Sequence, residues 1–180
     1  MKKLLLFIMA GIAFSCNNEA TTSKEAAKDT MAVTAEPTPA VMNYPYTIEH
    51  PDNWAVGSAS NTLAVLTSLK AWEDGKVDES VKYFADSVQV KFDGFEKKLS
   101  NDSLRVFFAG ARKAYKSVKI KMSDWESVIS KDKKEEWVTV WYRQSWETSK
   151  GKKDSSDIIN DLQLKDGKIV RLDEYSRKLH

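Results

Sequence analysis

The stretch from Leu63 to Val90 constrains the fold more than any other part of the chain, because its hydrophobic period changes within it. Apolar residues recur at helical spacing at Val65, Leu69 and Trp72, and Leu63 and Leu66 are expected to widen this stripe. Gly75 then ends the helix, since glycine takes a left-handed turn without a steric clash. A shorter helical segment follows, with Val77, Val81 and Phe84 at the same spacing. From Val88 apolar and polar residues alternate as they do in a strand. The stretch therefore predicts helix, short helix and strand in direct succession.

The rest of the chain predicts one more helix and then a series of strands. The helix begins near Asn101, and its buried stripe is expected to consist of Leu104, Phe107, Phe108, Ala111 and Tyr115. Asp166-Gly167 joins two alternating segments and indicates a tight hairpin. Helices that come first and antiparallel strands that follow predict an α+β domain. We expect one curved antiparallel sheet that wraps on three helices from the N-terminal half. The later strands are predicted at Val118–Ile129, Trp137–Thr148, Ser156–Leu164 and Lys168–Tyr175.

Charge argues against nucleic acid as a partner. The formal net charge is +2, and Lys2 and Lys3 lie in a segment that we expect to be removed. What remains is close to neutral, with basic residues scattered among acidic ones. Electrostatic binding of nucleic acid needs a basic face, which this pattern does not predict.

The N-terminus resembles a bacterial lipoprotein signal. Lys2 and Lys3 precede an apolar run that is too short to span a bilayer, and the run ends in Ala13-Phe14-Ser15-Cys16. The resemblance implies cleavage before Cys16, secretion across the inner membrane and a lipid anchor on Cys16. Asn17 resembles the residue found in lipoproteins sent on to the outer membrane of a Gram-negative bacterium. A plain secretory signal, with Cys16 as a free thiol, is the alternative.

Cys16 is the single cysteine of the chain, so the domain holds no internal disulfide and no cysteine zinc site. Changes in composition along the chain divide it into four segments. Residues 1–15 form the expected signal peptide, and residues 16–43 read as a disordered linker. Residues 44–57 carry aromatics and prolines and are predicted to be an extended arm packed on the domain, which spans 58–180.

Three motifs resemble the nuclear transport factor 2-like superfamily, including its SnoaL-like members. They are AWEDG, YFADSVQV and LKDGKIVRLDEY, and the resemblance covers about Ser58 to Tyr175. It implies a cone-shaped fold with a pocket between the concave face of the sheet and the helices. Members of the superfamily include isomerases, dehydratases, epoxide hydrolases and transport adaptors. The fold therefore does not specify the function.

The ketosteroid isomerase branch of that superfamily offers a test for catalysis. Enzymes of that branch use a tyrosine as one donor of the oxyanion hole, an aspartate as the general base, and a protonated aspartate as the second donor of the oxyanion hole. Aligned on the motifs, these positions fall on Ser68, Phe92 and Asn160. Phenylalanine accepts no proton, so the base of that reaction is missing, and we do not expect the reaction here.

Strand alternation predicts which side chains face the pocket. Asn160 and Leu162 share one face of their strand, and Glu174 lies on the inward face of the last strand. Glu174, with Tyr142, is a weak candidate for general acid–base catalysis if burial raises its pKa. The alternative for Glu174 is a carboxylate at the rim, either solvated or paired with a lysine. For the polar and aromatic side chains, the alternative is an ordinary role in the core. The predicted ligand pocket consists of Trp72, Phe92, Tyr142, Asn160, Leu162 and Glu174.

No metal and no cofactor are predicted. Asp154, Asp157 and Asp161 lack the spacing of a calcium loop, and Asp154 differs in strand parity from the other two. On the opposite, convex face of the sheet, Trp137, Trp141 and Arg143 are residue types favoured at interfaces. This face predicts either a homodimer contact or a surface covered by the Tyr44–Trp54 arm or by the domain's own side chains.

The leading hypothesis is a non-catalytic, membrane-anchored envelope lipoprotein whose pocket binds a small apolar molecule or a partner chain. Two alternatives stay open. One is an isomerase- or hydrolase-like enzyme that uses Glu174, and the other is a dimerising interaction module that uses the convex face.

Overall fold

The computed structural model describes residues 43–47 and 54–179 and divides the chain into one unit up to Tyr44 and a second from Pro45 onward. Every described helix and strand lies in the second unit. The predicted signal peptide, Cys16 and the linker before Asn43 lie outside the described residues. Among the described residues, no helix has the length and apolar character needed to cross a membrane.

The elements follow the order expected from the change of hydrophobic period, preceded by one short strand. They are β1 (Trp54–Val56), α1 (Ala59–Glu73), α2 (Val77–Val81), β2 (Phe84–Phe92), β3 (Phe95–Ser100), α3 (Asn101–Lys113), β4 (Tyr115–Ser130), β5 (Glu136–Thr148), β6 (Lys153–Lys165) and β7 (Lys168–Lys178).

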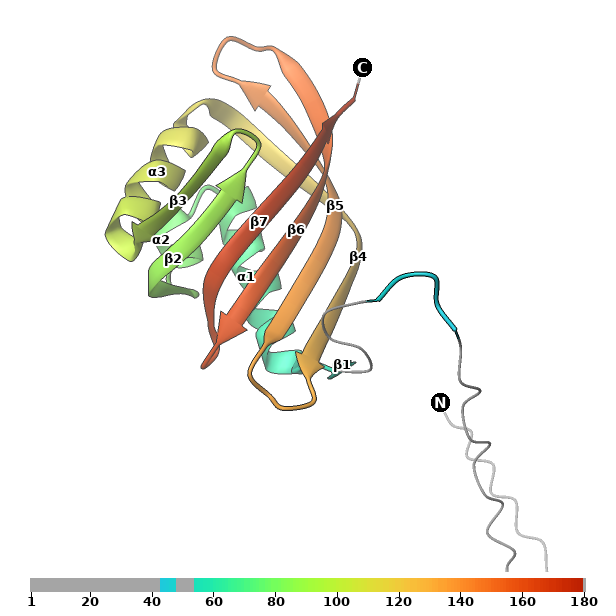
Figure 1. The fold of residues 1–180 in the computed structure, drawn as a ribbon. Helices are drawn as coiled ribbons and strands as arrows, with labels where there is room; N and C mark the ends of the chain where they lie inside the picture. The colour runs from blue at the N-terminus through green and yellow to red at the C-terminus, as the bar shows by residue number, and fades with distance from the viewer. Residues whose placement is uncertain (1–42, 48–53, 180) are drawn as a thin grey trace, which may run out of the picture. The chain divides into compact units, whose positions relative to one another are not determined.

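The described strands form one seven-stranded sheet with the order β1-β4-β5-β6-β7-β2-β3. Strands β4 to β7 make an antiparallel meander in which each strand pairs with the next (Figure 1). The prediction of an antiparallel sheet needs one correction, because β2 pairs with β7 in parallel. A pairing between strands so far apart in sequence leaves no trace in the local period of either one.

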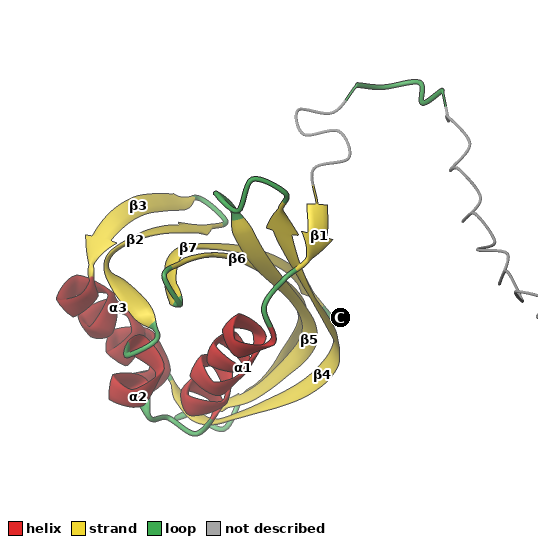
Figure 2. Cartoon of the chain, turned by 90° about the horizontal axis from the view of Figure 1, so that it is seen from below, coloured by secondary structure: helices red, strands yellow, loops and turns green. Residues whose placement is uncertain are grey.

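The sheet curves around the helices, which lie on its concave side (Figure 2). A view from below shows α1 inside the curve of β4 to β7, while α2 and α3 lie toward β2 and β3. The predicted α+β class, with a curved sheet wrapped on three helices of the N-terminal half, is confirmed.

The residues of the turn between β6 and β7 explain how these two strands are joined. Asp166 and Gly167 have φ angles of 52° and 74°, the left-handed values that a two-residue hairpin turn requires. The register between β6 and β7 shifts next to this turn, so Ile169 rather than Val170 is fully buried. Strict alternation along the last strand predicts Val170 on the same inward face as Leu172 and Glu174, and the irregularity reverses the parity of Val170.

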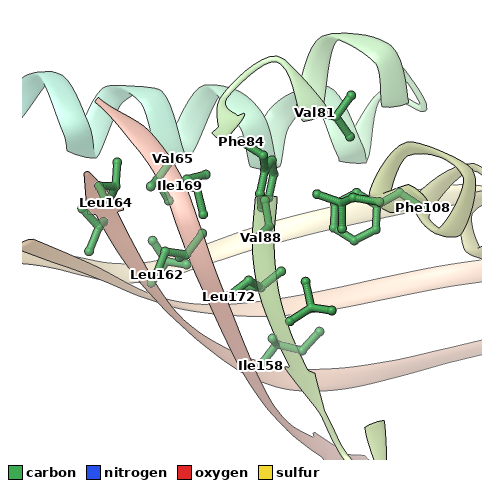
Figure 3. Packing of buried hydrophobic residues seen from close by; sticks show 14 of the residues in the cluster. Val65, Val81, Phe84, Val88, Phe108, Ile158, Leu162, Leu164, Ile169 and Leu172 are labelled. Atoms are coloured by element: carbon green, nitrogen blue, oxygen red, sulfur yellow. The ribbon is translucent and has the colours of Figure 1, made fainter. Parts of the chain in front are cut away.

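The core lies between the helices and the concave face, where side chains of α1, β2, β6 and β7 meet (Figure 3). Val65 is 2% exposed and supports the predicted stripe of α1, whereas Leu63 is 65% exposed and does not belong to it. Phe84 had been assigned to the short second helix. It begins β2 instead, because its backbone pairs with Ile169 of β7.

Two polar side chains hold the helices over the sheet. The Asn101 Nδ2 group donates to the carbonyl oxygens of Val81, Phe84 and Ala85, at 3.1 to 3.2 Å, and so fixes the start of α3 beside β2. Arg112, near the end of α3, donates to the carbonyl oxygens of Trp72 and Glu73. These carbonyls belong to the last turn of α1, where the regular helical hydrogen bonds run out, although the Trp72 oxygen also accepts from the Gly75 amide at 3.0 Å. The ends of α1 and α3 are therefore tied together.

Candidate functional site

A cavity of about 240 Å³ lies between the helices and the concave face of the sheet. Most of its lining is aliphatic or aromatic, and the polar groups are few. The lining residues are Val65, Ser68, Leu69, Trp72, Ser80, Phe84, Phe92, Phe107, Phe108, Ala111, Tyr115, Val140, Tyr142, Gln144, Asn160, Leu162, Leu172 and Glu174.

All six residues of the predicted pocket line this one cavity. The structure thus brings together side chains from one helix and four strands; their role in binding stays a prediction. Trp72 comes from α1, Phe92 from β2, Tyr142 from β5, Asn160 and Leu162 from β6, and Glu174 from β7.

Strand pairing explains why three of these residues meet. Asn160 lies directly opposite Val140 of β5 and Glu174 of β7, so all three side chains point to the concave face. Leu162 pairs with Leu172 one step further along the same face. Alternation with a period of two carries the inward direction from each strand to the next.

The polar end of the cavity is built on Asn160. Its Nδ2 group donates to the Tyr142 hydroxyl oxygen at 3.0 Å. Its Oδ1 atom is buried and has no hydrogen-bond partner among the described residues. Buried polar atoms are nearly always paired, because desolvation without a partner costs about 1–3 kcal/mol. Asn160 therefore brings an unpaired acceptor to the mainly apolar lining of the cavity.

Glu174 is the charged group of this site. The side chain is mostly buried, and burial raises its pKa to about 7. It makes no hydrogen bond or ion pair with any described residue. Burial and then the negative charge of Glu174 raise the pKa of the Tyr142 phenol, which stays protonated. The site thus holds a neutral phenol and a carboxyl group that titrates near neutral pH.

The positions aligned with the isomerase branch also line the cavity, but they carry no comparable chemistry. The buried Ser68 hydroxyl donates to the carbonyl oxygen of Ser80 at 3.0 Å. Phe92 stacks on Phe107 with ring centroids 5.8 Å apart. Stacked aromatic rings therefore occupy the position at which that reaction would need its general base.

Sequence reasoning missed several lining residues. Phe107 and Phe108 had been assigned only to the core stripe of α3, and Gln144 had not been singled out. Gln144 accepts a hydrogen bond from the Trp72 indole Nε1 at 3.1 Å, which fixes the ring at the cavity wall. It lies two residues after Tyr142, so strand parity contained the signal that would have placed it inward.

The convex face keeps its predicted orientation. The Arg171 guanidinium carbon lies 5.3 Å from the centroid of the Trp137 ring, and Arg143 pairs with Asp157 at 2.8 Å. Trp137 and Trp141 are partly buried within the chain. Of the predicted arm, β1 pairs with β4 and forms one edge of the sheet, and residues 48–53 lie outside the described part. Both the homodimer and the covered surface stay predictions.

The three aspartates that were considered as metal ligands are engaged separately. Asp157 pairs with Arg143 and Arg177, Asp161 accepts a hydrogen bond from Thr139, and Asp154 pairs with Lys178. Among the described residues, no group of three or more His, Cys, Asp or Glu side chains is arranged to hold a metal ion.

No protein-family model matches the chain, and no curated protein matches it by sequence. Solved structures do match. An LEH-like epoxide hydrolase of Mycobacterium tuberculosis superposes with a TM-score of 0.55 at 12% identity, covering 67% of this chain and 84% of that one. AusH from Aspergillus nidulans superposes with a TM-score of 0.54 at 13% identity, covering 67% and 86%. The chain has the nuclear transport factor 2-like fold.

A third similar structure is RV0760c from Mycobacterium tuberculosis in complex with estradiol-17beta-hemisuccinate. It has a TM-score of 0.53 and 12% identity, covering 66% of this chain and 94% of that one. At such identities the likeness establishes the nuclear transport factor 2-like fold alone. Reaction and ligand must be argued from the cavity of this chain.

Proposed function

We propose that this chain is a lipid-anchored lipoprotein of the cell envelope whose nuclear transport factor 2-like domain binds a small, mainly apolar molecule without transforming it. The observation that carries the proposal is the cavity of about 240 Å³, lined mainly by apolar side chains and with an unpaired acceptor at one end. This combination of a concave apolar surface and a few convergent polar groups is typical of ligand sites. The lipobox ending in Cys16 supports the anchor.

The volume of the cavity limits the size of the ligand that it can hold. Sites for drug-sized molecules occupy about 300–1,000 Å³, so a cavity of about 240 Å³ suits a smaller molecule. Two similar structures support a mainly apolar ligand. RV0760c was solved in complex with a steroid ester, and TerC was co-crystallised with polyporic acid. Both ligands are larger, so only the apolar character carries over to the proposal.

The chemistry of the site supports binding over catalysis. An enzyme of the isomerase or hydrolase kind would need Glu174 to be buried in the cavity and within reach of a second catalytic group. Glu174 meets the first condition, but no described residue hydrogen-bonds to it. Phe92 occupies the position of the base in the branch that the sequence resembles. The enzyme is therefore the less supported alternative.

Filling the cavity tests the proposal. Leu162→Phe adds a ring on the cavity side of β6, whereas Ile159→Phe adds the same ring on the opposite face, where Ile159 is 39% exposed. A library of small hydrophobic compounds is screened by thermal unfolding. A ligand at 100 times its Kd should stabilise the wild type and Ile159→Phe by about 2.7 kcal/mol. Leu162→Phe should lose most of that shift.

Two outcomes would count against this function. One is a library in which no compound raises the melting temperature of the wild type. The other is an equal ligand response in Leu162→Phe and Ile159→Phe, which would place the binding site elsewhere on the domain.

The anchor has its own test. Cys16→Ser removes the sulfur that would carry the lipid, and the chain should move from the membrane fraction to the soluble fraction of the cell envelope. Mass spectrometry of the wild type should find a mature N-terminus at Cys16 that carries acyl chains. Unchanged membrane association of Cys16→Ser, with an N-terminus elsewhere, would contradict a lipoprotein anchor.

A further inference from the structure

We propose that the molecule bound in this cavity carries a protonated amine at one end of an apolar body, and that Glu174 and Asn160 hold the ammonium group. This inference rests on the proposed binding function and names the chemical class of the ligand.

The charge of the cavity wall points to a cation. Glu174 is the only charged residue among the described residues that line the cavity, and none of the lining residues is basic. Two buried or partly buried aspartates elsewhere on the sheet have basic partners within the chain. Asp173, the neighbour of Glu174 on the other face of β7, pairs with Arg171, and Asp157 pairs with Arg143. The carboxylate in the cavity is left for a partner that the described residues do not supply.

The second acceptor lies beside the first. Asn160 and Glu174 are directly opposed on β6 and β7, a relation that puts the Cβ atoms of two side chains about 5 Å apart. The free Oδ1 atom of Asn160 is an acceptor, as are both oxygens of an ionised Glu174. An ammonium group offers three donors and no acceptor, which matches this pair. A carboxylate or phosphate on the ligand would instead meet acceptors and a like charge.

The aromatic side chains that line the cavity are also compatible with a ligand that carries an ammonium group on an apolar body. Aromatic rings from two helices and β2 surround the cavity, including Trp72, Phe92, Phe107 and Phe108. The face of such a ring carries negative potential and attracts a cation placed over it. The same rings pack against the apolar body of the ligand. The Trp72 indole N–H is already bonded to Gln144, so it does not compete as a donor.

Ionisation of Glu174 gives the binding a pH dependence. The other titratable groups that line the cavity among the described residues are the phenols of Tyr115 and Tyr142. The lining residues contributed by α1, α2, β2 and β6 include none. Because the pKa of Glu174 is about 7 in the empty site, the affinity for an amine should rise between pH 5.5 and pH 8. An alkyl amine stays protonated throughout that range.

Three probes with one skeleton test the charge preference: 2-phenylethylamine, 2-phenylethanol and phenylacetate. Affinities are measured by calorimetry at pH 8 on the full chain and on Glu174→Gln. The amine should bind the wild type at least about tenfold more tightly than the alcohol, and phenylacetate should bind most weakly. In Glu174→Gln the amine should fall to the level of the alcohol. The alcohol should bind both proteins alike, which shows that the variant keeps its cavity.

Further outcomes separate this inference from the binding function. If the alcohol binds but the amine binds no more tightly, or if the preference for the amine survives in Glu174→Gln, the amine inference is wrong and the binding function stands. If none of the three probes binds and no hydrophobic compound in the library does, both are wrong. An amine affinity that does not change between pH 5.5 and pH 8 also overturns the role of Glu174.

Discussion

Glu174→Gln should be more stable than the wild type by about 3 kcal/mol at pH 8 and about equally stable at pH 4. The reason is the shift of the Glu174 pKa from 4.5 to about 7, which burial causes. Between these two values the folded chain holds a proton that the unfolded chain releases. Raising the pH through this window therefore destabilises the wild type, and the full cost is present above pH 7. Glutamine is neutral throughout and carries no such cost.

The measurement is urea unfolding of both proteins at several pH values from 4 to 8. Glu126→Gln is the matched control, since Glu126 is exposed on β4. Its difference from the wild type should vary little with pH. Other carboxyl groups titrate equally in the wild type and in Glu174→Gln, so their contributions cancel in the difference. A difference for Glu174→Gln that stays constant across the range would show that the carboxyl group is solvated.

This cost has a functional meaning. A domain that buries a carboxylate without a partner gives up stability for as long as the site is empty. A cationic ligand would supply the missing partner and recover that stability. The proposed amine therefore explains why a carboxylate with no partner among the described residues lies in a mainly apolar cavity.

The position of Glu174 shows both what the sequence predicts and what it cannot. Strand alternation placed Glu174 on the cavity side of β7, because a period of two fixes the face once Leu172 is known to be inside. Its burial did not follow from the sequence. The sequence made β7 the last strand of the meander, but the parallel pairing with β2 covers that edge. Lys91 pairs with Asp173, which brings the neighbouring Phe92 toward Glu174.

The fold was easier to predict than the site, for a physical reason. Periods of 3.6 and 2 and the turn at Asp166-Gly167 are local, and each is written in consecutive residues. The pairing of β2 with β7 and the bond between Trp72 and Gln144 join residues far apart in the chain. No local pattern encodes them. Leu63 failed for a related reason: a helical stripe can be read from the sequence, but its width depends on what packs against it.

Leu104→Ala should cost about 2–5 kcal/mol of unfolding free energy, the usual range when a fully buried leucine is truncated. Leu104 is 0% exposed and lies on α3, which contributes Phe107 and Phe108 to the cavity wall. Truncation removes apolar contacts between this helix and the core and leaves a void that the neighbours fill only in part. Since domains of this kind have about 5–15 kcal/mol of stability in total, the loss is large.

Val106→Ala is the matched control for this change, because Val106 lies on the same helix and is 65% exposed. It should alter the free energy of unfolding by no more than about 0.5 kcal/mol. Urea unfolding of the two variants at one pH gives both values. A cost below about 1 kcal/mol for Leu104→Ala would mean that α3 rests only loosely on the sheet. The cavity would then lack a fixed wall on that side, and a ligand site of defined shape would no longer follow from the fold.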